Sequence, residues 1–338
     1  MKKILLVLTL IAGMLVFAGC GSDSGKDNTK ANSGTADGKQ ITLKLGHIQS
    51  ENDLWQKGAE KFAEEVEKRT NGQVKVKIYP NSTLGGDRDM AEGLQMGSVD
   101  FALIAGVLGN FEPSFQILEL PYLFRDEEHF KKAIYGPVGQ ELNDRLLKNA
   151  NIRNLAYWER GPRELTSNKP INSLKDIQGL KLRVPEIPAM VETWKAMGAN
   201  PTPMAWGEVY TGLQQNVIEA QENPIPFIYG GRIYEVQKYI AMTHHKYEYV
   251  TMSMSNKTWE KLTPEQQKAI QEAAKVATDY ENNLVKQETE KELKEMEAKG
   301  MKVTNPNIEE FAAAAKTVHK KFADKVAPDI YQKIVELK

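Results

Sequence analysis

The chain has very little cysteine and no excess of charge of either sign. Its 338 residues include one cysteine, Cys20, so an internal disulfide framework and a multi-cysteine metal site are both excluded. Lysine and arginine number 44 against 45 aspartates and glutamates, which gives a formal net charge of -1. Because no long basic run accompanies this balance, we expect no nucleic acid partner.

The sequence also lacks the local motifs of common exported enzymes. It contains no Gly-x-Ser-x-Gly elbow, no His-Glu-x-x-His zinc pair and no Walker loop. The only adjacent histidines, His244 and His245, would point to opposite faces of a strand, so we predict no shared metal. Glutamates between Glu281 and Glu297 alternate with lysines, which favours a solvated helix face over a catalytic pair. We therefore expect no metal and no cofactor, and an exported hydrolase is only an alternative.

Long hydrophobic runs are absent except near the N-terminus. Lys2 and Lys3 precede a run over residues 4–17 that is almost wholly apolar, too short for a comfortable membrane span and typical of a signal peptide. Small residues before Cys20 resemble a bacterial lipoprotein signal. We predict a signal peptide over residues 1–19, lipidation of Cys20 and a polar, flexible tether over residues 20–40. The protein would then be exported and lipid-anchored at the outer face of the cytoplasmic membrane.

Residues 41–104 alternate between strand and helix patterns. The helical segment has apolar residues at spacings of three and four and stops at Asn71-Gly72, whereas the segments on either side alternate in steps of two. This βαβαβ order predicts a parallel sheet buried on both faces. The positions that define it are Leu43 and Leu45, then Trp55, Ala59, Phe62 and Val66, then Val74, Val76 and Ile78, then Met90 and Leu94, and finally residues 99–104.

Arg183 lies in a short predicted strand that ends beside a proline. Leu180, Leu182 and Val184 alternate with polar residues, so Arg183 should leave the opposite face of the strand. Pro185 cannot donate to a central ladder, which places Arg183 at the carboxyl end of the strand, where open α/β sheets bind ligands. A guanidinium presents a fork of donors that matches a carboxylate. We therefore predict a carboxylate receptor; the alternative is an ordinary surface arginine or ion pair.

Two later segments should bring more polar groups to the same edge of the sheet. We predict a helix from residue 206 or 207 to residue 215, followed by a short strand over residues 217–220. The exit of that strand carries Glu222 and Asn223. Convergence of several donors at one sheet edge would form a carboxylate pocket. The donors are Arg163, Arg183 and Asn223.

A long helix is predicted near the C-terminal end of the chain. Thr263, Pro264 and Gln266 combine a capping residue, proline at the first helical position and glutamine three residues after the cap. Extended to Gly300, the helix would be about 54 Å long at about 1.5 Å per residue. This length predicts that it runs along both lobes, with a coiled-coil seam as the alternative. The stripe expected against the globular surface is Ile270, Ala273, Ala277, Tyr280 and Leu284.

Several motifs together resemble one family of proteins. They occupy residues 158–168, 179–185, 198–210 and 221–224, with shorter matches at 84–90, 120–122 and 234–239. This set resembles the substrate-binding proteins of tripartite ATP-independent periplasmic (TRAP) transporters. The resemblance implies an α/β, two-lobed periplasmic-binding-protein-like fold with a hinge cleft and a long helix along both lobes. We place lobe 1 at residues 41–160 plus about 249–288, and lobe 2 at residues 161–248 plus about 289–338.

The resemblance also implies a function and its partners. The protein would be a monomeric receptor, not an enzyme, that closes its hinge around a small carboxylate solute. It would deliver the solute to the paired membrane subunits of a TRAP transporter driven by an ion gradient. A solute-binding lipoprotein of an ATP-driven importer is the alternative, since the fold alone does not separate the two.

The resemblance assigns roles to individual residues. Arg183 matches the principal carboxylate clamp, Arg163 the second arginine and Asn223 the orienting amide. Trp206 would stack on the solute, with core packing as the alternative. The remaining candidates are Asp87, for solute hydroxyls or as a helix N-terminal acid, His47 and Gln49 facing the cleft, and Glu222 in contact with solute or in a surface hydrogen bond.

Departures from the family pattern narrow the solute. Sialic acid binders carry a glutamate where this chain has Ala105 and an asparagine where it has Ile48, so sialate is disfavoured. The hydroxyl-capable side chains of Asp87, Gln49 and His47 favour a sugar acid, such as a uronate or aldonate, over a dicarboxylate or oxo acid.

Overall fold

A computed structural model describes residues 40–338. The predicted signal peptide, the lipidation of Cys20 and nearly all of the predicted tether lie outside the described residues and stay predictions. Residues 40–338 belong to one compact unit. Within the described part of the chain, no helix is long and apolar enough to cross a membrane.

The strands form one mixed sheet across the molecule. They are β1 Ile41–Gly46, β2 Val74–Tyr79, β3 Phe101–Ile104, β4 Ile152–Ser167, β5 Lys181–Val184, β6 Asn200–Pro203, β7 Ala220–Pro224, β8 Tyr239–Ser255 and β9 Lys302–Thr304. Their order is β2-β1-β3-β8-β4-β7-β5-β6, and β9 pairs with β8. The pairs at the two ends of the sheet are parallel, whereas β8 is antiparallel to both β3 and β4.

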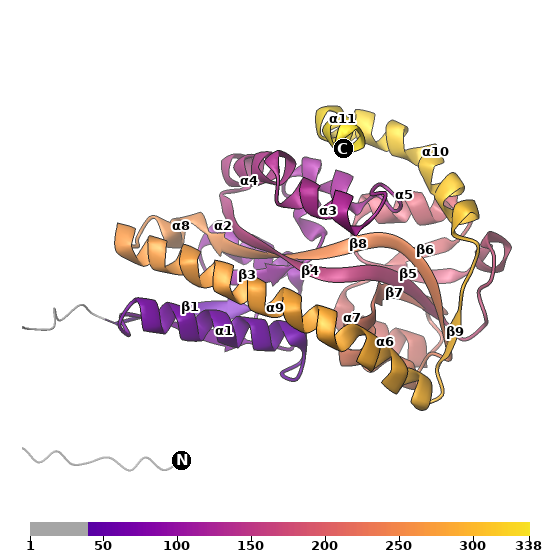
Figure 1. Cartoon of the computed structure of the whole chain (residues 1–338), viewed down its shortest axis with the longest axis horizontal. Coiled ribbons are helices and arrows are strands. Elements are labelled where there is room, and N and C mark those ends of the chain that lie inside the picture. The colour runs from indigo at the N-terminus through magenta and orange to yellow at the C-terminus, as the bar shows by residue number, and fades with distance from the viewer. Residues whose placement is uncertain (1–39) are drawn as a thin grey trace, which may run out of the picture. The chain divides into compact units, whose positions relative to one another are not determined.

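Helices cover the sheet on two sides. The α-helices are α1 Leu54–Arg69, α2 Asp87–Met96, α3 Glu127–Ile134, α4 Pro137–Ala150, α5 Pro188–Ala196, α6 Trp206–Gln214, α7 Ile225–Gly230, α8 Asn256–Trp259, α9 Pro264–Ala298, α10 Ile308–Val326 and α11 Pro328–Glu336. Short 3₁₀ turns are η1 Val107–Asn110, η2 Pro113–Glu119, η3 Leu174–Ile177 and η4 Ile233–Glu235. In Figure 1, α3, α4, α10 and α11 lie above β4 and β8, and α1, α7 and α9 lie below them.

The first lobe has the predicted βαβαβ order. β1 pairs in the parallel sense with β2 and with β3, so both crossovers are helical, as expected. The predicted apolar face of α1 is buried, and the ring of Phe62 contacts the ring of Phe101 edge-on, with centroids 5.2 Å apart. Asp53 caps α1 by accepting a hydrogen bond from the backbone N–H of Trp55 at 2.9 Å. The predicted order of elements and their parallel pairing are confirmed. The prediction that this sheet is buried on both faces is wrong for β1 and β2, because Thr42, Lys44 and Lys77 are exposed.

The second lobe contains β5 and α6 where the sequence predicts them, but the strand predicted over residues 217–220 is wrong. Asn216 adopts a left-handed backbone with φ 57°, and the N–H of Val217 donates back to Gly212 at the end of α6. These residues therefore complete the helix end, and Val217 is 56% exposed. β7 starts only at Ala220, so Glu222 lies inside a strand that pairs with β4, and not at a strand exit.

Two long strands and one long helix connect the lobes. β4 continues past Gly161, the start of the predicted second lobe, and pairs with β8 on both sides of this residue. The register shifts between Glu159 and Gly161, where Gly161 has φ +78°, and again between Arg163 and Leu165. Such bulges bend a strand and re-aim its side chains without ending it. The predicted lobe boundaries, which place a break at residue 161, stay predictions.

Helix α9 begins with the predicted capping box and crosses both lobes. Thr263 and Gln266 cap each other reciprocally, and the helix extends for 35 residues. It lies against α1, β4 and α7, and Figure 1 shows it running along the sheet. The predicted contact stripe is wrong at Tyr280, which is 40% exposed; the buried stripe continues from Ala277 to Glu281 and Val285.

Two glutamates of α9 are therefore not on a solvated face, contrary to the sequence prediction. Glu281 is fully buried and Glu292 is 8% exposed, while most of the other acidic residues of this segment face solvent. Glu281 is buried because it lies four residues beyond Ala277, on the helix face that packs against the sheet. Neither carboxyl oxygen of Glu281 accepts a hydrogen bond from any residue between 40 and 338.

Replacing Glu281 with methionine should stabilise the protein at neutral pH. Burial, reinforced by Asp53, raises the pKa of Glu281 well above its usual 4.5. Its unfavourable contribution is therefore absent below about pH 4.5 and grows as the pH rises toward the folded-state pKa. We expect Glu281→Met to raise the free energy of unfolding near pH 8 by about 1 to 3 kcal/mol in urea denaturation. Glu290→Gln on the exposed face is the control, and an equal gain at pH 4 and pH 8 would contradict the explanation.

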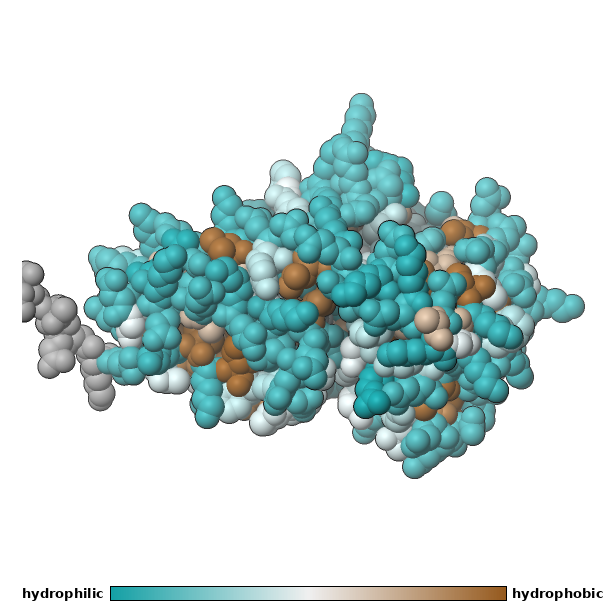
Figure 2. Space-filling view, turned by 60° about the horizontal axis from the view of Figure 1, so that its bottom comes forward, coloured by the Kyte–Doolittle hydropathy of each residue, from teal (hydrophilic) through white to brown (hydrophobic). Residues whose placement is uncertain are grey.

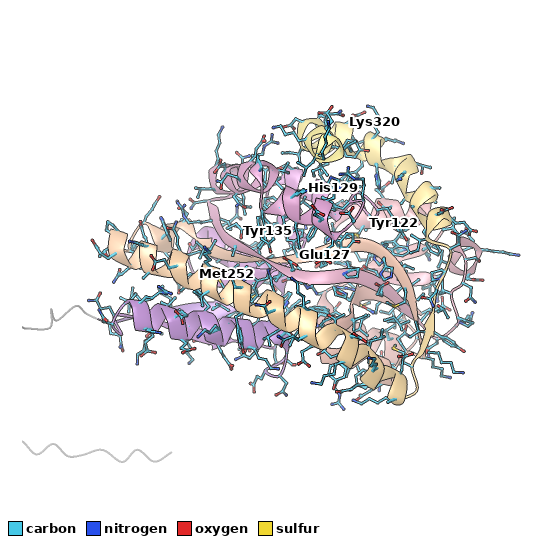
Figure 3. The ribbon with its side chains drawn as sticks, in the orientation of Figure 1. Tyr122, Glu127, His129, Tyr135, Met252 and Lys320 are labelled. Carbon is cyan, nitrogen blue, oxygen red and sulfur yellow. The ribbon has the colours of Figure 1, made fainter. Side chains whose placement is uncertain are left out.

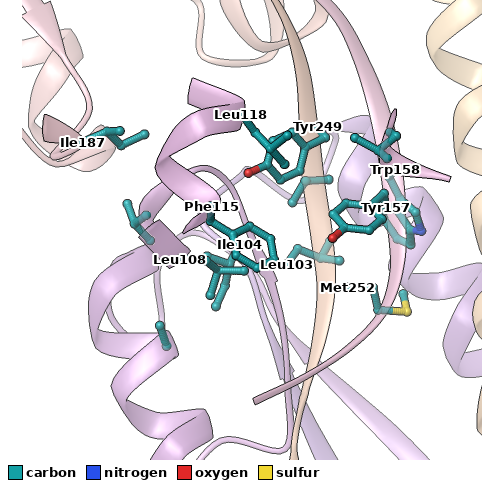
Figure 4. Packing of buried hydrophobic residues seen from close by; sticks show 14 of the residues in the cluster. Leu103, Ile104, Leu108, Phe115, Leu118, Tyr157, Trp158, Ile187, Tyr249 and Met252 are labelled. Carbon is teal, nitrogen blue, oxygen red and sulfur yellow. The ribbon is translucent and has the colours of Figure 1, made fainter. Parts of the chain in front are cut away.

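The main core packs around the crossing strands. Trp158 and Tyr249 are fully buried, and Figure 4 shows them with Tyr157 beside Leu103 and Leu118. The indole N–H of Trp158 donates to the hydroxyl of Thr278 on α9 at 3.0 Å. The strands and the helix that join the lobes are thus fixed to each other in this region. The face in Figure 2 is mostly hydrophilic, with small, separate hydrophobic patches.

Candidate functional site

Arg183 lies at the carboxyl end of β5, as predicted, and lines a cavity of about 310 Å³. The residue is only 4% exposed. Its Nε and Nη2 atoms donate to the backbone oxygen of Met204 at 2.9 and 2.6 Å. These bonds fix the plane of the guanidinium and leave Nη1 without a partner in the described part of the chain. Burial lowers the pKa of Arg183 to about 10, so the side chain remains cationic at neutral pH.

Residues from both lobes line this cavity. A neighbouring hollow of about 260 Å³ shares part of the wall, including Trp206, so the two form one continuous cleft region. The lining residues used below are Ile48, Ser82 and Asp87 from the first lobe and Arg183, Met204 and Trp206 from the second. Among residues 40–338, no carboxylate forms an ion pair with Arg183, although three other buried cations have such partners, namely Arg160, Arg163 and Lys246.

Asp87 opens α2 and lines the same cavity as Arg183. Its Oδ1 atom is buried and accepts no hydrogen bond from a described residue. Burial raises the pKa of Asp87 to about 7, against the lowering effect of the Arg160 and Arg183 charges. Helix capping is done by Asp89, whose Oδ2 accepts from the N–H of Gly86 at 2.9 Å. Asp87 is therefore free to exchange hydrogen bonds with hydroxyl groups in the cavity.

Arg163 is held by two protein carboxylates and by the backbone oxygen of Glu222. Its Nη2 donates to Glu222 Oε1 at 2.8 Å, its Nε to Glu222 Oε2 at 2.5 Å and its Nη1 to Glu248. Burial alone would lower the pKa of Arg163, but the charges of Glu222 and Glu248 raise it. The side chain is 3% exposed and has no free nitrogen in this arrangement. Its predicted role as a second solute contact stays a prediction.

Glu222 is fully buried, so the alternative of a surface hydrogen bond is wrong. In addition to its contacts with Arg163, Oε2 of Glu222 lies 2.8 Å from Nε2 of His245. Burial would raise the pKa of Glu222, but Arg163 and His245 together lower it to about 2. The residue is thus an anion at neutral pH that positions Arg163.

Asn223 lies beside these groups in β7. Its Nδ2 donates to Oε1 of Gln221 at 2.8 Å, and Gln221 in turn donates to the hydroxyl of Thr166 at 2.9 Å. Arg163, Arg183 and Asn223 lie on the neighbouring strands β4, β5 and β7, and their predicted convergence into one carboxylate pocket stays a prediction. The orienting role of Asn223 toward a solute stays a prediction.

Trp206 is the aromatic wall of the cleft. It lines both hollows, and its ring centroid is 4.3 Å from that of Phe227 and 5.9 Å from the guanidinium carbon of Arg183. The side chain is partly exposed, so it combines packing against Phe227 with a face toward the cavity. Both of its predicted uses are compatible with this position.

His47 and Gln49 follow β1, but they differ in position. Gln49 lines the smaller hollow, and its buried Nε2 has no described partner. His47 is fully buried and its Nε2 lies 2.9 Å from Oε1 of Gln56. Burial lowers the pKa of His47 below its usual value, so the ring is neutral at pH 7. The structure places Gln49 at the cleft and His47 behind it.

Several buried charges around Glu248 escaped the sequence analysis. Lys246 contacts Glu119 at 2.8 Å and Glu248 at 2.7 Å, which continues the chain of charges that ends at Arg163. Arg160 is 3% exposed and lies 3.8 Å from Glu248. The only sequence signal for Arg160 was its position inside the motif over residues 158–168. The alternation of apolar and polar residues does not reveal the bulge in β4 that sets the direction of its side chain.

A larger hollow of about 820 Å³ lies away from these groups, between α4 and α9. Tyr135, which is labelled in Figure 3, lies at its wall. Its hydroxyl donates to Glu159 at 3.1 Å and accepts from Asn282 at 3.0 Å. The charged residues around it, among them Lys275 and Asp279, are of both signs. We place no solute there, because no arginine lines this hollow and Lys275, Asp279 and Lys286 are exposed.

Metal binding receives no support from the residues that the structure describes. No group of three His, Cys, Asp or Glu side chains among them is arranged to hold a metal ion. His245 contacts Glu222, and His244 contacts Glu164, so the adjacent histidines face different partners.

A cavity between two lobes, with a buried and unpaired arginine on its wall, defines a two-lobed solute-binding protein. Residues 45–325 match the DctP family, described as bacterial extracellular solute-binding protein, family 7, and the chain belongs to this family. The sialic acid-binding periplasmic protein SiaP of Vibrio cholerae is 35% identical over 297 residues, 88% of this chain and 92% of the relative.

Solved structures agree with this assignment. A TRAP periplasmic solute-binding protein from Roseobacter denitrificans with bound L-galactonate has a TM-score of 0.83 and 36% identity, over 88% of this chain and 99% of that one. The sugar acid binding protein DctPAm from Advenella mimigardefordensis, in complex with galactonate, has a TM-score of 0.86 and 28% identity, over 89% and 98%.

Family membership decides several sequence predictions. The protein is a TRAP-type substrate-binding protein with an α/β, two-lobed fold, and both predictions are confirmed. It is a receptor and not an enzyme, which removes the hydrolase alternative, and it is exported, as the family description states. The alternative of an ATP-driven importer loses its basis for the same reason.

Proposed function

We propose that this receptor captures a small sugar acid by its carboxylate, with Arg183 as the clamp, and delivers it to TRAP membrane subunits. The observation that carries the proposal is the state of Arg183: a cation 4% exposed on the cavity wall, with no ion-pair partner among residues 40–338. Burying an uncompensated charge is costly, so such a residue is best explained by an anionic ligand. The two bonds to Met204 hold its plane ready for a bidentate contact.

The remainder of the cavity favours a hydroxylated solute. Asp87 and Gln49 present a buried acceptor and a buried donor without described partners, and hydroxyl groups satisfy both. The L-galactonate and galactonate bound to the two similar structures support the same class. A uronate or aldonate is therefore preferred over a dicarboxylate or oxo acid, and Ala105 and Ile48 disfavour sialate, although a similar protein is a sialic acid binder.

Closure of the lobes would couple binding to transport. Ligand groups come from both lobes, so a bound solute stabilises the closed arrangement relative to the open one. β4, β8 and α9 are the connections across which the lobes would move. A TRAP permease would recognise the closed form. Lipidation at Cys20 would keep the receptor at the membrane, and the receptor would act as a monomer.

Thermal-shift screening of the purified protein tests the proposal. The panel should contain aldonates, uronates, succinate, pyruvate and sialate. A ligand at about 100 times its dissociation constant adds about 2.7 kcal/mol to the stability of the folded state. We expect galactonate-like acids to raise the melting temperature most and sialate not to raise it. If no acid on the panel stabilises the protein, the proposed function is wrong.

A further inference from the structure

Strand β8 bulges where it crosses between the lobes. The register of β4 and β8 shifts between Arg163 and Leu165, which leaves residues 242–245 of β8 opposite Glu164 alone. We call residues 242–245 the β8 bulge. Before it β8 pairs with β9, and after it β8 pairs with β3 of the first lobe. Because an insertion of this kind bends a strand and re-aims its side chains, the β8 bulge sets the path of the strand between the lobes.

Glu164 holds the β8 bulge through His244. The backbone N–H of His244 donates to Oε2 of Glu164 at 2.9 Å, and Nδ1 of the imidazole lies 2.5 Å from Oε1. The second contact is an ion pair and not an aligned hydrogen bond. Glu164 is fully buried, whereas the side chain of His244 is 42% exposed. His244 has a left-handed backbone with φ 43°, so the two contacts hold a conformation that is costly for a residue with a Cβ atom.

Tyr122 of the first lobe holds the same bulge. Its backbone N–H donates to the oxygen of His245 at 2.6 Å, and its hydroxyl donates to the backbone oxygen of Thr243 at 2.9 Å. Tyr122 also has a left-handed backbone, with φ 59°. Contacts from two distant segments of the chain, and not the pairing of β8 itself, therefore fix the β8 bulge.

The β8 bulge places His245 against the buried charges beside the cleft. The Nδ1 atom of His245 lies 2.8 Å from the hydroxyl of Thr243, and its Nε2 lies 2.8 Å from Oε2 of Glu222. The same oxygen of Glu222 accepts from Nε of Arg163 at 2.5 Å. A shift of the bulge would therefore move the imidazole that holds Glu222 and, through it, Arg163.

The charge of His244 changes near neutral pH. Glu164 raises the pKa of His244 above its usual 6.5, against the opposing effect of burial. The phenols of Tyr122 and Tyr247 also face Glu164, and burial raises the pKa of both, so they stay uncharged below about pH 10. A raised folded-state pKa gives a stabilisation that is complete below pH 6.5 and is lost as the pH rises through the folded-state value.

We propose that His244 and Glu164 form a positioning pair that holds the β8 bulge while His244 is protonated. Neither residue lines the two hollows of the cleft, so the pair acts through His245. It keeps Glu222 and Arg163 in place for solute binding. This inference rests on the proposed function, and it makes solute affinity depend on a proton bound outside the cleft.

An NMR titration of the histidine signals, without solute, tests the pair itself. We expect His244 to titrate above pH 6.5 in the unaltered protein and at or below its usual value in Glu164→Gln. This substitution removes the charge but keeps an oxygen that accepts from the N–H of His244. His244→Asn identifies the signals of His244, and asparagine adopts a left-handed backbone readily. An unchanged pKa of His244 in Glu164→Gln would overturn the pair.

Isothermal titration with L-galactonate at pH 6 and pH 9 tests the effect on binding. The ratio of the dissociation constants of variant and unaltered protein should be about two to five at pH 6, the scale of a partly exposed ion pair, and close to one at pH 9. Both Glu164→Gln and His244→Asn should show this change. The ratio is compared because Asp87, whose pKa burial raises to about 7, titrates in the same window in every protein.

Glu159→Gln is the matched control. Glu159 also lies on β4 and forms an ion pair, with Lys131 at 2.7 Å. Burial would lower the pKa of Lys131, but Glu127 and Glu159 raise it above its usual 10.5, so this pair does not titrate between pH 6 and pH 9. The ratio for Glu159→Gln should therefore be the same at both pH values.

The outcomes separate this inference from the proposed function. A ratio for Glu164→Gln and His244→Asn that is equal at pH 6 and pH 9 would show that the pair only supports the fold, and the proposed function would stand without it. If Glu164→Gln does not fold by circular dichroism, His244→Asn decides the question, because its side chain is partly exposed. If the unaltered protein binds no sugar acid, the proposed function fails and this inference fails with it.

Discussion

Arg183→Ala should raise the dissociation constant for the sugar acid by a factor of roughly 30 to 5,000. This range corresponds to about 2 to 5 kcal/mol, the cost of removing one partner from a buried, hydrogen-bonded charge pair. The substitution leaves the solute carboxylate in a desolvated cavity with no cation to pair with it, because Arg163 is occupied by Glu222 and Glu248. Isothermal titration of the variant against the unaltered protein measures the change.

Arg183→Lys should weaken binding of the sugar acid almost as much as Arg183→Ala. An ammonium group cannot donate simultaneously to Met204 and to two carboxylate oxygens in one plane. Lys181→Ala is the control, since Lys181 lies on the same strand but is exposed. The clamp assignment would be wrong if Arg183→Ala bound the acid as tightly as the Lys181→Ala control.

Glu222→Gln should destabilise the protein by about 3 to 5 kcal/mol, the usual cost of removing one partner from a buried ion pair. The side chain keeps its size, so the loss comes from charge and not from a cavity. Arg163 would lose the carboxylate that accepts from its Nε and Nη2, and His245 would lose its partner at 2.8 Å. Urea denaturation at pH 7 measures the effect, and Glu290→Gln serves as the exposed control.

The same variant has a defined pH dependence. In the folded protein Arg163 and His245, acting against burial, hold the pKa of Glu222 at about 2, compared with 4.5 for an ordinary glutamate. A depressed folded-state pKa contributes stability above pH 4.5 that is lost as the pH falls toward about 2. The unaltered protein should therefore lose more stability than Glu222→Gln over this window. Parallel stability curves for the two proteins would contradict the ion-pair explanation.

Local signals predicted those elements whose boundaries are chemically marked. Helix α9 starts at a capping box, and β5 ends before Pro185, so both were predicted close to their observed bounds. β4 and β7 were not, because pairing and not local pattern sets their extent. The bulges of β4 allow the strand to continue past Gly161, and the left-handed Asn216 delays β7 to Ala220. Tertiary packing likewise buries Glu281. The lysines near it in the sequence had led to the prediction of a solvated helix face.

The candidate site also contains residues that local sequence signals predict and residues that only tertiary contacts reveal. Arg183 was predicted from a strand end, and its unpaired guanidinium on the cavity wall agrees with that position. The resemblance ranked Arg183 ahead of Arg163, but the sequence did not show that the fold pairs Arg163 with Glu222, a residue 59 positions away. Nor could it find Arg160, whose orientation depends on the bulge in β4 and on rings supplied by α1 and α7. Contacts between distant segments decide which arginine remains open to a solute.

A crystal structure of the protein with the sugar acid that stabilises it most would test the central claim directly. We predict that both carboxylate oxygens lie within hydrogen-bonding distance of the Arg183 guanidinium, in the cavity between Asp87 and Trp206. A solute whose carboxylate lies away from Arg183, or a solute bound in the larger hollow between α4 and α9, would contradict the account.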